Sequence, residues 1–151
     1  MSIDKKFIEK FINVTSKAAI ASFAFVGKKD KKAADKAAVD SMRKELNKID
    51  IQGKIVIGEG ELDKAPMLYI GEKVGTNNGP SLDIAVDPLE GTNFAANNLP
   101  GALSVIAVAE KNNLFNAPET YMNKIAIKNN NEKIVDLDFP LKKNISNLSE
   151  S

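Results

Sequence analysis

The chain has no cysteine and no histidine among its 151 residues. Thiolate and imidazole are the usual protein ligands of zinc, haem iron and iron–sulfur clusters, so their absence argues strongly against those centres. The same absence excludes catalysis by serine–histidine or cysteine–histidine pairs. Any metal bound here must accept oxygen ligands, as magnesium and manganese do.

The absence of disulfides, of long apolar runs and of a large net charge restricts the expected cellular location and binding partners. A chain without cysteine forms no disulfide, which suits a reducing compartment. Residues 1–6 are charged and lead into no apolar run of signal-peptide or membrane-spanning length, so the expected location is cytoplasmic. A net charge of +1 gives no field suited to nucleic acid. Neither nucleic acid nor a membrane is therefore expected as a partner.

The apolar pattern predicts an α+β fold. Helical spacing over 3–26 and 31–48 predicts two amphipathic helices. Runs rich in Ile, Val and Leu predict strands over 54–57, 67–74, 82–87, 102–109, 124–128 and 133–137. This order predicts two N-terminal helices layered on a mixed or mostly antiparallel sheet, in a single domain over residues 1–151. The polar ending, residues 144–151, indicates no further element.

The segment Asp87-Pro88-Leu89-Glu90-Gly91-Thr92 follows a buried strand. Pro88 lacks an amide donor and restricts Asp87 to extended conformations, so Asp87 is predicted at the end of that strand. Glu90 then reaches the same region, and two carboxylates can bind a divalent cation. Gly91 to Phe94 can present free amides to a phosphate at a helix N-terminus, and the Thr92 hydroxyl can orient a water. The alternative is a plain strand-to-helix turn with Glu90 exposed.

A second predicted strand, 54–57, also leads into acid, at Gly58-Glu59-Gly60-Glu61. The glycines allow the backbone to turn Glu59 inward, and a bridging cation would reconcile this acidic loop with a phosphate. It is not a dinucleotide-binding fingerprint, because Asp63 stands where the third glycine is required. A solvated turn is the alternative.

A third candidate segment, residues 28–35, joins the two predicted helices. Asp30 is a plausible N-cap, and Asp35 is expected about one turn inside the second helix. The lysines of this segment, Lys31 among them, can attract a phosphorylated substrate. An exposed lysine-rich corner is the alternative.

Four runs together resemble a known family. They are IVIGEGELDKAPMLYIGEKVG, DIAVDPLEGT, ALSVIAV and NAPETYMNK, and they resemble the bacterial class II fructose-1,6-bisphosphatases of the lithium-sensitive sugar-phosphatase superfamily. The likeness extends from about Phe7 to about Leu148. Glutamate at position 90, where the superfamily usually has aspartate, is a feature of the class II branch. Residues 97–100 depart from the family pattern.

The resemblance implies a two-metal site with Mn²⁺ or Mg²⁺. Asp35 and Glu59 match ligands of one cation, and Asp87 and Glu90 match ligands of the second. The phosphate would contact Glu90, Gly91 and Thr92, with Thr92 placing the attacking water. Asp35 or Glu59 would accept its proton. Two further residues that match the family, Tyr121 and Lys31, would bind the substrate.

The implied reaction is hydrolysis of fructose 1,6-bisphosphate to fructose 6-phosphate and phosphate, a step of gluconeogenesis. Family members are much longer, so the chain is expected to correspond to their N-terminal half. Three alternatives follow: a non-catalytic remnant or binding module, one half of a split phosphatase with a separately encoded C-terminal half, or an inositol-phosphate phosphatase. An open sheet edge at the boundary also predicts a homo-oligomer or poor solubility.

Overall fold

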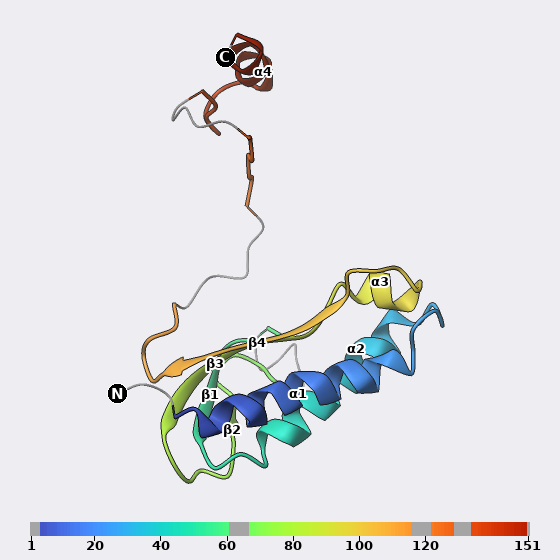
Figure 1. Cartoon of the computed structure of the whole chain (residues 1–151), viewed down its shortest axis with the longest axis vertical. Coiled ribbons are helices and arrows are strands. Elements are labelled where there is room, and N and C mark those ends of the chain that lie inside the picture. The colour runs from blue at the N-terminus through green and yellow to red at the C-terminus, as the bar shows by residue number, and fades with distance from the viewer. Residues whose placement is uncertain (1–3, 61–66, 116–121, 129–133, 151) are drawn as a thin grey trace. The chain divides into compact units, whose positions relative to one another are not determined.

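The structure is a computed structural model that describes residues 4–60, 67–115, 122–128 and 134–150. It divides into two compact units, Met1–Ala117 and Pro118–Ser151, each described here by itself. In the first unit the elements are α1 (Lys6–Phe23), α2 (Lys31–Leu46), β1 (Gln52–Ile57), β2 (Lys73–Val74), β3 (Ser81–Glu90), α3 (Thr92–Ala96) and β4 (Leu103–Glu110) (Figure 1). The second unit contains α4 (Leu141–Ser149). The prediction of a single domain over 1–151 stays a prediction.

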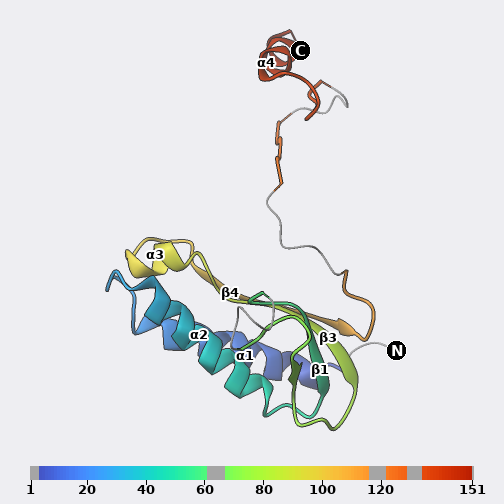
Figure 2. The ribbon, with the colours of Figure 1, turned by 180° about the vertical axis from the view of Figure 1, so that it is seen from behind.

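The strands form one mixed sheet in the order β2-β1-β3-β4. Its central pair, β1 and β3, is parallel, and the outer pairs β1–β2 and β3–β4 are antiparallel. The helices α1 and α2 lie side by side and pack against the sheet (Figures 1 and 2). The predicted α+β class, with two N-terminal helices layered on a mixed sheet, is confirmed.

The core lies between the two helices and the sheet. On α1 the buried apolar residues recur at the predicted helical spacing: Phe7, Phe11, Val14 and Ala18. On α2 and in the turn after it, the predicted stripe of Val39, Met42, Leu46 and Ile49 is likewise buried. The sheet contributes alternate residues of β3, Leu82, Ile84 and Val86, as expected for one face of a pleated strand. Burying each large apolar side chain contributes about 1.5–3 kcal/mol.

One predicted strand of the first unit is mostly absent. The prediction of a strand over 67–74 is wrong except at Lys73–Val74. The chain turns there instead: Leu68 and Gly71 both have positive φ, 55° and 97°, a conformation incompatible with a strand. Leu68 is fully buried, so its apolar character served the core rather than a strand.

The second unit also corrects the sequence analysis. Residues 122–128 belong to no strand or helix, and residues 134–137 are irregular. The polar ending, predicted to form no element, is mostly helix α4. The Asn144 side chain on this helix accepts from the Asp136 amide at 2.9 Å and donates to the Asp136 carbonyl at 2.8 Å. Polar residues thus hold the segment before α4 in place.

Among the residues that the structure describes, none of the helices combines the length and the apolar character needed to span a lipid bilayer.

Candidate functional site

The parallel pairing of β1 and β3 brings two predicted site residues to the same edge of the sheet. Ile57 at the end of β1 is the register partner of Ala85 on β3. Glu59 follows Ile57 by two residues, and Asp87 follows Ala85 by two. Both acids are half-buried. Because β1 and β3 are parallel, the chain runs from both strands toward the same end of the sheet, where Glu59 and Asp87 follow the last register pair.

The backbone around Glu59 is fixed by the loop that returns from it. The Glu59 amide donates to the Leu68 carbonyl at 2.9 Å, and the Ile70 amide donates to the Gly60 carbonyl at 2.8 Å. A Cβ added at Gly58 would lie 2.1 Å from the Leu68 carbonyl oxygen, so only glycine fits there. The expectation that glycine sets the path of this loop is supported at Gly58. Residues 61–66 lie outside the described residues.

A partly buried ion pair that the sequence did not predict anchors the same loop. Glu72 is buried, and Arg43 of α2 donates from Nε to its Oε1 at 2.5 Å. Its other carboxylate oxygen accepts from the Leu68 amide. The only sequence signal was a charged residue, Glu72, within the largely apolar segment 67–74, which does not reveal a partner 29 positions away.

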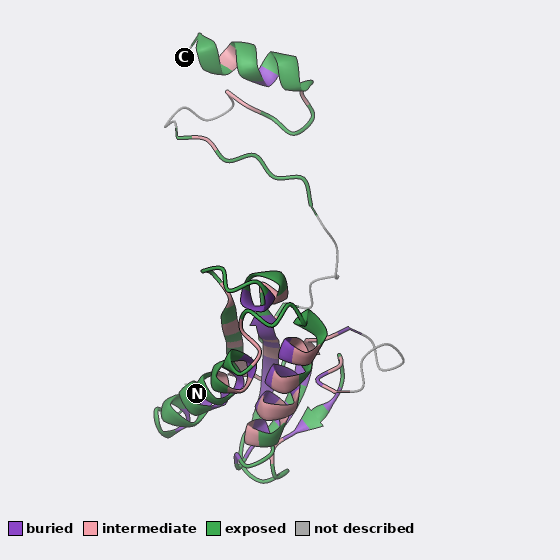
Figure 3. Cartoon of the chain, turned by 90° about the vertical axis from the view of Figure 1, so that its right-hand side faces the viewer, coloured by how far each residue is buried: buried purple, intermediate pink, exposed green. Residues whose placement is uncertain are grey.

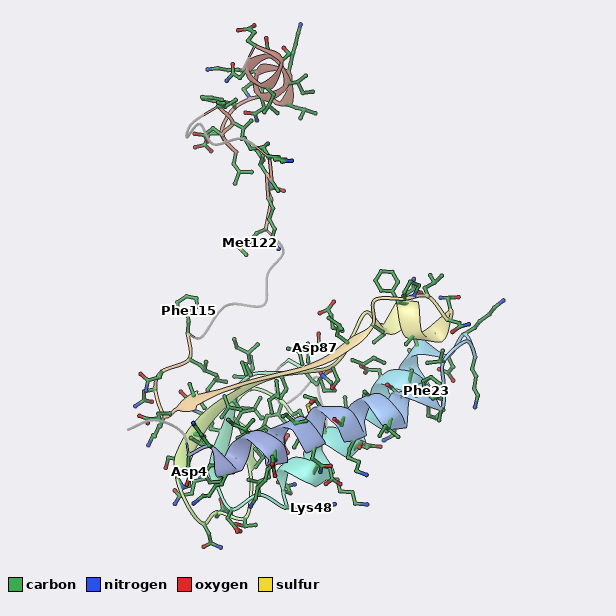
Figure 4. All side chains as sticks on the ribbon, in the orientation of Figure 1. Asp4, Phe23, Lys48, Asp87, Phe115 and Met122 are labelled. Atoms are coloured by element: carbon green, nitrogen blue, oxygen red, sulfur yellow. The ribbon has the colours of Figure 1, made fainter. Side chains whose placement is uncertain are left out.

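Asp87 lies within β3 rather than at its end. The strand was predicted to stop at Asp87, but it continues to Glu90 with an irregular register against β4 between these two residues. Pro88 causes the irregularity, since it has no amide to donate to the ladder. The Leu89 amide instead donates to Asp87 Oδ1 at 3.1 Å. Figure 4 labels Asp87 on this strand.

The carboxylate of Asp87 is in an unfavourable electrostatic environment. Burial, a hydrogen bond to the Glu90 carboxyl group and the charges of Glu90 and Asp35 raise its pKa from 3.8 to about 6, against the lowering effect of the Leu89 amide. Burial also raises the pKa of Asp35. Two neighbouring acids, Glu90 of β3 and Asp35 of α2, therefore disfavour the charged form of Asp87, and a divalent cation would relieve this repulsion.

Asp35 reaches this region because of how α2 begins. The Asp30 side chain caps the helix by accepting from the Ala33 amide at 3.0 Å, as predicted. Asp35 then lies one turn inside α2 and is half-buried, while Lys31 is its first residue and is exposed. The preceding loop is tied to α3, because the Lys29 amide donates to the Ala96 carbonyl at 2.8 Å. The start of α2 is thereby held beside α3.

The turn after Glu90 has the geometry that its sequence predicts. Gly91 adopts a left-handed conformation, φ 78°, that favours glycine, and an added Cβ would lie 2.9 Å from the Phe94 ring. Thr92 is half-buried and begins α3. One part of the prediction is wrong: the Phe94 amide is not free, since it donates to the Gly91 carbonyl at 2.8 Å.

The candidate acidic ligands lie on neighbouring elements, but they do not form a complete coordination shell for a metal ion. In the described part of the chain, no group of three or more acidic side chains is arranged to hold a metal ion as it stands. The charges of Glu90 and Asp35 act on Asp87, and the pairing of β1 with β3 carries the chain toward Glu59 at the same end of the sheet. Tyr121, predicted to contact substrate, lies outside the described residues. All the candidate ligands are oxygen donors, which fit Mg²⁺ or Mn²⁺.

Carboxylates on neighbouring strands and a helix, followed by a glycine-hydroxyl turn into a helix, are typical of metal-dependent phosphate chemistry. Over residues 5–151 the chain matches the family described as "Bacterial fructose-1,6-bisphosphatase, glpX-encoded". The chain belongs to this family of class 2 fructose-1,6-bisphosphatases. The resemblance stated from the sequence is confirmed.

Individual relatives agree. The chain is 50% identical over 148 residues to a D-fructose 1,6-bisphosphatase class 2/sedoheptulose 1,7-bisphosphatase of Synechococcus sp. (strain CC9902), covering 98% of this chain and 44% of that protein. It is 49% identical over 140 residues to fructose-1,6-bisphosphatase 1 class 2 of Escherichia coli (strain K12), covering 93% of this chain and 42% of that protein. The chain thus spans less than half the length of these relatives.

Proposed function

We propose that the chain carries the metal-binding and phosphate-binding part of a phosphatase that hydrolyses fructose 1,6-bisphosphate to fructose 6-phosphate and phosphate. The observation that carries this proposal is the raised pKa of Asp87, caused by burial and by the neighbouring acids Glu90 and Asp35. A carboxylate whose pKa is raised by burial and by neighbouring acids is typical of a functional site. Family membership supports the reaction.

In this proposal the ligands divide as the family resemblance implies. Asp35 and Glu59 hold one divalent cation, and Asp87 and Glu90 hold the other. Mn²⁺ or Mg²⁺ fits these oxygen donors. When bound, the cations polarise the phosphoryl group and lower the pKa of a water. The half-buried positions of Asp35, Glu59 and Asp87 support their role as ligands, because partial burial strengthens their attraction for a cation, whereas Glu90 is exposed.

The chain's own groups supply the remaining chemistry. Thr92 orients the attacking water through its hydroxyl, and Asp35 or Glu59 accepts the proton. The left-handed turn at Gly91 lets the backbone between Glu90 and Thr92 approach the phosphate closely. Lys31, exposed at the start of α2, attracts the substrate, and Tyr121 contacts it.

A second proposal concerns the extent of the chain. Because the chain covers 44% of its Synechococcus relative, it can also act as a binding module without turnover, or as one half of a split phosphatase whose C-terminal half is separately encoded. An inositol-phosphate phosphatase is the nearest enzymatic alternative. The single domain, cytoplasmic location, role in gluconeogenesis and homo-oligomer inferred from the sequence stay predictions.

The test is phosphate release by the purified chain. Fructose 1,6-bisphosphate with Mn²⁺ is compared with inositol monophosphate, and Asp87→Asn serves as the inactive control. Turnover of the sugar bisphosphate that Asp87→Asn abolishes supports the phosphatase. A rise in melting temperature with Mn²⁺ but no turnover supports the binding module, since a ligand that prefers the folded state stabilises it. If Mn²⁺ produces no turnover and no rise in melting temperature, both the phosphatase and the binding-module proposals are contradicted.

A further inference from the structure

Asn78 lies in the loop that leads from β2 to β3, and it is the only asparagine of the chain that glycine follows. Residues 76–80 are exposed to solvent (Figure 3). Among the described residues, neither the Asn78 side chain nor the Gly79 amide has a hydrogen-bond partner. The peptide group between these two residues is therefore accessible to reaction with the Asn78 side chain.

The loop is anchored on both sides of this peptide group. Before it, the Asn77 amide donates to the Ile51 carbonyl at 3.1 Å. After it, the Pro80 carbonyl accepts from the Gln52 amide at 2.9 Å, and the Gly79 carbonyl accepts from Gln52 Nε2 at 3.3 Å. The Gly79 amide nitrogen is therefore unbonded within an otherwise anchored turn.

The conformation of the loop requires glycine at position 79. Gly79 has φ 85°, and an added Cβ would lie 2.2 Å from the Asp50 carbonyl oxygen. Because glycine has no side chain, the Gly79 nitrogen is also unhindered toward the side chain of the preceding residue. The fold thus requires the same neighbour that makes Asn78 reactive.

We propose that Asn78 is a site of spontaneous deamidation, with solvent water as the co-reactant. The Gly79 amide nitrogen attacks Asn78 Cγ, so that an N–Cγ bond forms and the Cγ–Nδ2 bond breaks. Ammonia leaves with the proton of the Gly79 amide, and the product is a cyclic succinimide. Water then opens the ring at Cγ, which gives aspartate, or at the main-chain carbonyl, which gives isoaspartate.

Isoaspartate disturbs the start of the parallel pair β1–β3. Its main chain passes through the former side chain and is longer by a carbon atom, so Gly79 must shift, although it lies against the Asp50 carbonyl. Gln52, which bonds to Pro80 and Gly79, is also the register partner of Ser81 at the beginning of β3. The isoaspartate form should therefore be less stable. This inference does not depend on the proposed phosphatase function.

The test is peptide-mapping mass spectrometry of the full chain, sampled over time during incubation at mildly alkaline pH. Asn98 and Asn112 are internal controls, since both are exposed residues of turns. The amide after each belongs to a residue with a side chain and donates to a backbone carbonyl, at 2.8 Å and 3.1 Å. We expect Asn78 to deamidate at least about tenfold faster than either control, because glycine has no Cβ to hinder the attack.

No deamidation at Asn78, or a rate equal to that of the controls, would overturn the proposal. A second measurement tests the structural consequence. The isoaspartate fraction, isolated by chromatography, should melt at a lower temperature than the fresh chain, whereas Asn78→Ser incubated in the same way should keep its melting temperature. An isoaspartate fraction as stable as the fresh chain would overturn the claim that the modification disturbs the β1–β3 pair.

Discussion

Arg43 on α2 and Glu72 just before β2 form an ion pair, with 2.5 Å between Arg43 Nε and Glu72 Oε1. The Glu72 side chain is 5% exposed and that of Arg43 is 42% exposed, so a buried acid meets a partly solvated base. Glu72 also accepts from the Leu68 amide, and the Leu68 carbonyl accepts from the Glu59 amide. One ion pair thus connects α2 to the backbone of a candidate metal ligand.

Removing the base should destabilise the protein. Arg43→Met leaves the Glu72 carboxylate buried without its charged partner, and we expect a loss of about 2–3 kcal/mol, below the range for fully buried pairs because Arg43 is partly exposed. Urea unfolding measures it. Lys44→Met, at the exposed neighbouring position, is the control and should cost less than about 0.5 kcal/mol. Equal effects of the two substitutions would contradict a structural role for the pair.

Gly58→Ala should displace the Glu59 loop. The added methyl would lie 2.1 Å from the Leu68 carbonyl oxygen, which is backbone and cannot rotate away. We expect a loss of about 1–3 kcal/mol from this overpacking. We also expect weaker Mn²⁺ binding by calorimetry, because Glu59 moves with the loop. Unchanged Mn²⁺ affinity in a folded Gly58→Ala protein would show that Glu59 is not a ligand of the cation.

The stability of the metal-free protein should fall as the pH rises from about 4 to about 6. Asp87 has a pKa of about 6 in the folded state against 3.8 as the reference value. Between these values the folded state retains a proton that the unfolded state has released, so rising pH favours unfolding. Asp87→Asn should reduce this slope in urea unfolding measured across pH. A slope unaffected by that substitution would contradict the raised pKa.

Mn²⁺ should reverse this dependence. The cation competes with the proton on Asp87, so the rise in melting temperature caused by Mn²⁺ should grow as the pH passes through about 6. Scanning fluorimetry at fixed Mn²⁺ between pH 5 and 7 tests it. A Mn²⁺ effect that does not vary over this interval would place the cation away from Asp87.

The N-cap of α2 positions Asp35 and should contribute measurably to stability. Asp30→Ala removes the hydrogen bond to the Ala33 amide, with an expected loss of about 1 kcal/mol in urea unfolding. The control is Asp40→Ala, which removes an exposed ion pair with Lys36 and should cost about 0.5 kcal/mol. If Asp40→Ala costs as much as Asp30→Ala, the cap has no special role.

The sequence alone predicted those structural features that depend on local periodicity or on the residues of a single turn. The buried stripes of α1 and α2 repeat at helical spacing, and the Asp30 cap and the Gly91 turn depend on neighbouring residues. The acidic ends at Glu59 and Asp87 were visible because each follows an apolar run. That they lie toward the same end of the sheet could not be predicted, because it depends on the parallel pairing of β1 and β3, which no local pattern specifies.

Features set by distant contacts could not be predicted. Leu68 is apolar because it fills the core from a turn, so its run resembled a strand. Glu72 and Arg43 are 29 positions apart, and neither has a local signal for the pair. Helix α4 was missed because Asn144 and Asn147 look like loop residues, whereas their side chains bond to the backbone of Asp136 and Ile134.

The most direct test of the central claim is anomalous diffraction from crystals of this chain grown with Mn²⁺. The account predicts Mn²⁺ peaks with Asp35, Glu59, Asp87 and Glu90 oxygens at roughly 2.0–2.6 Å, the range for hard cations bound by carboxylates. Mn²⁺ bound elsewhere, with these four side chains directed away from one another, would contradict it.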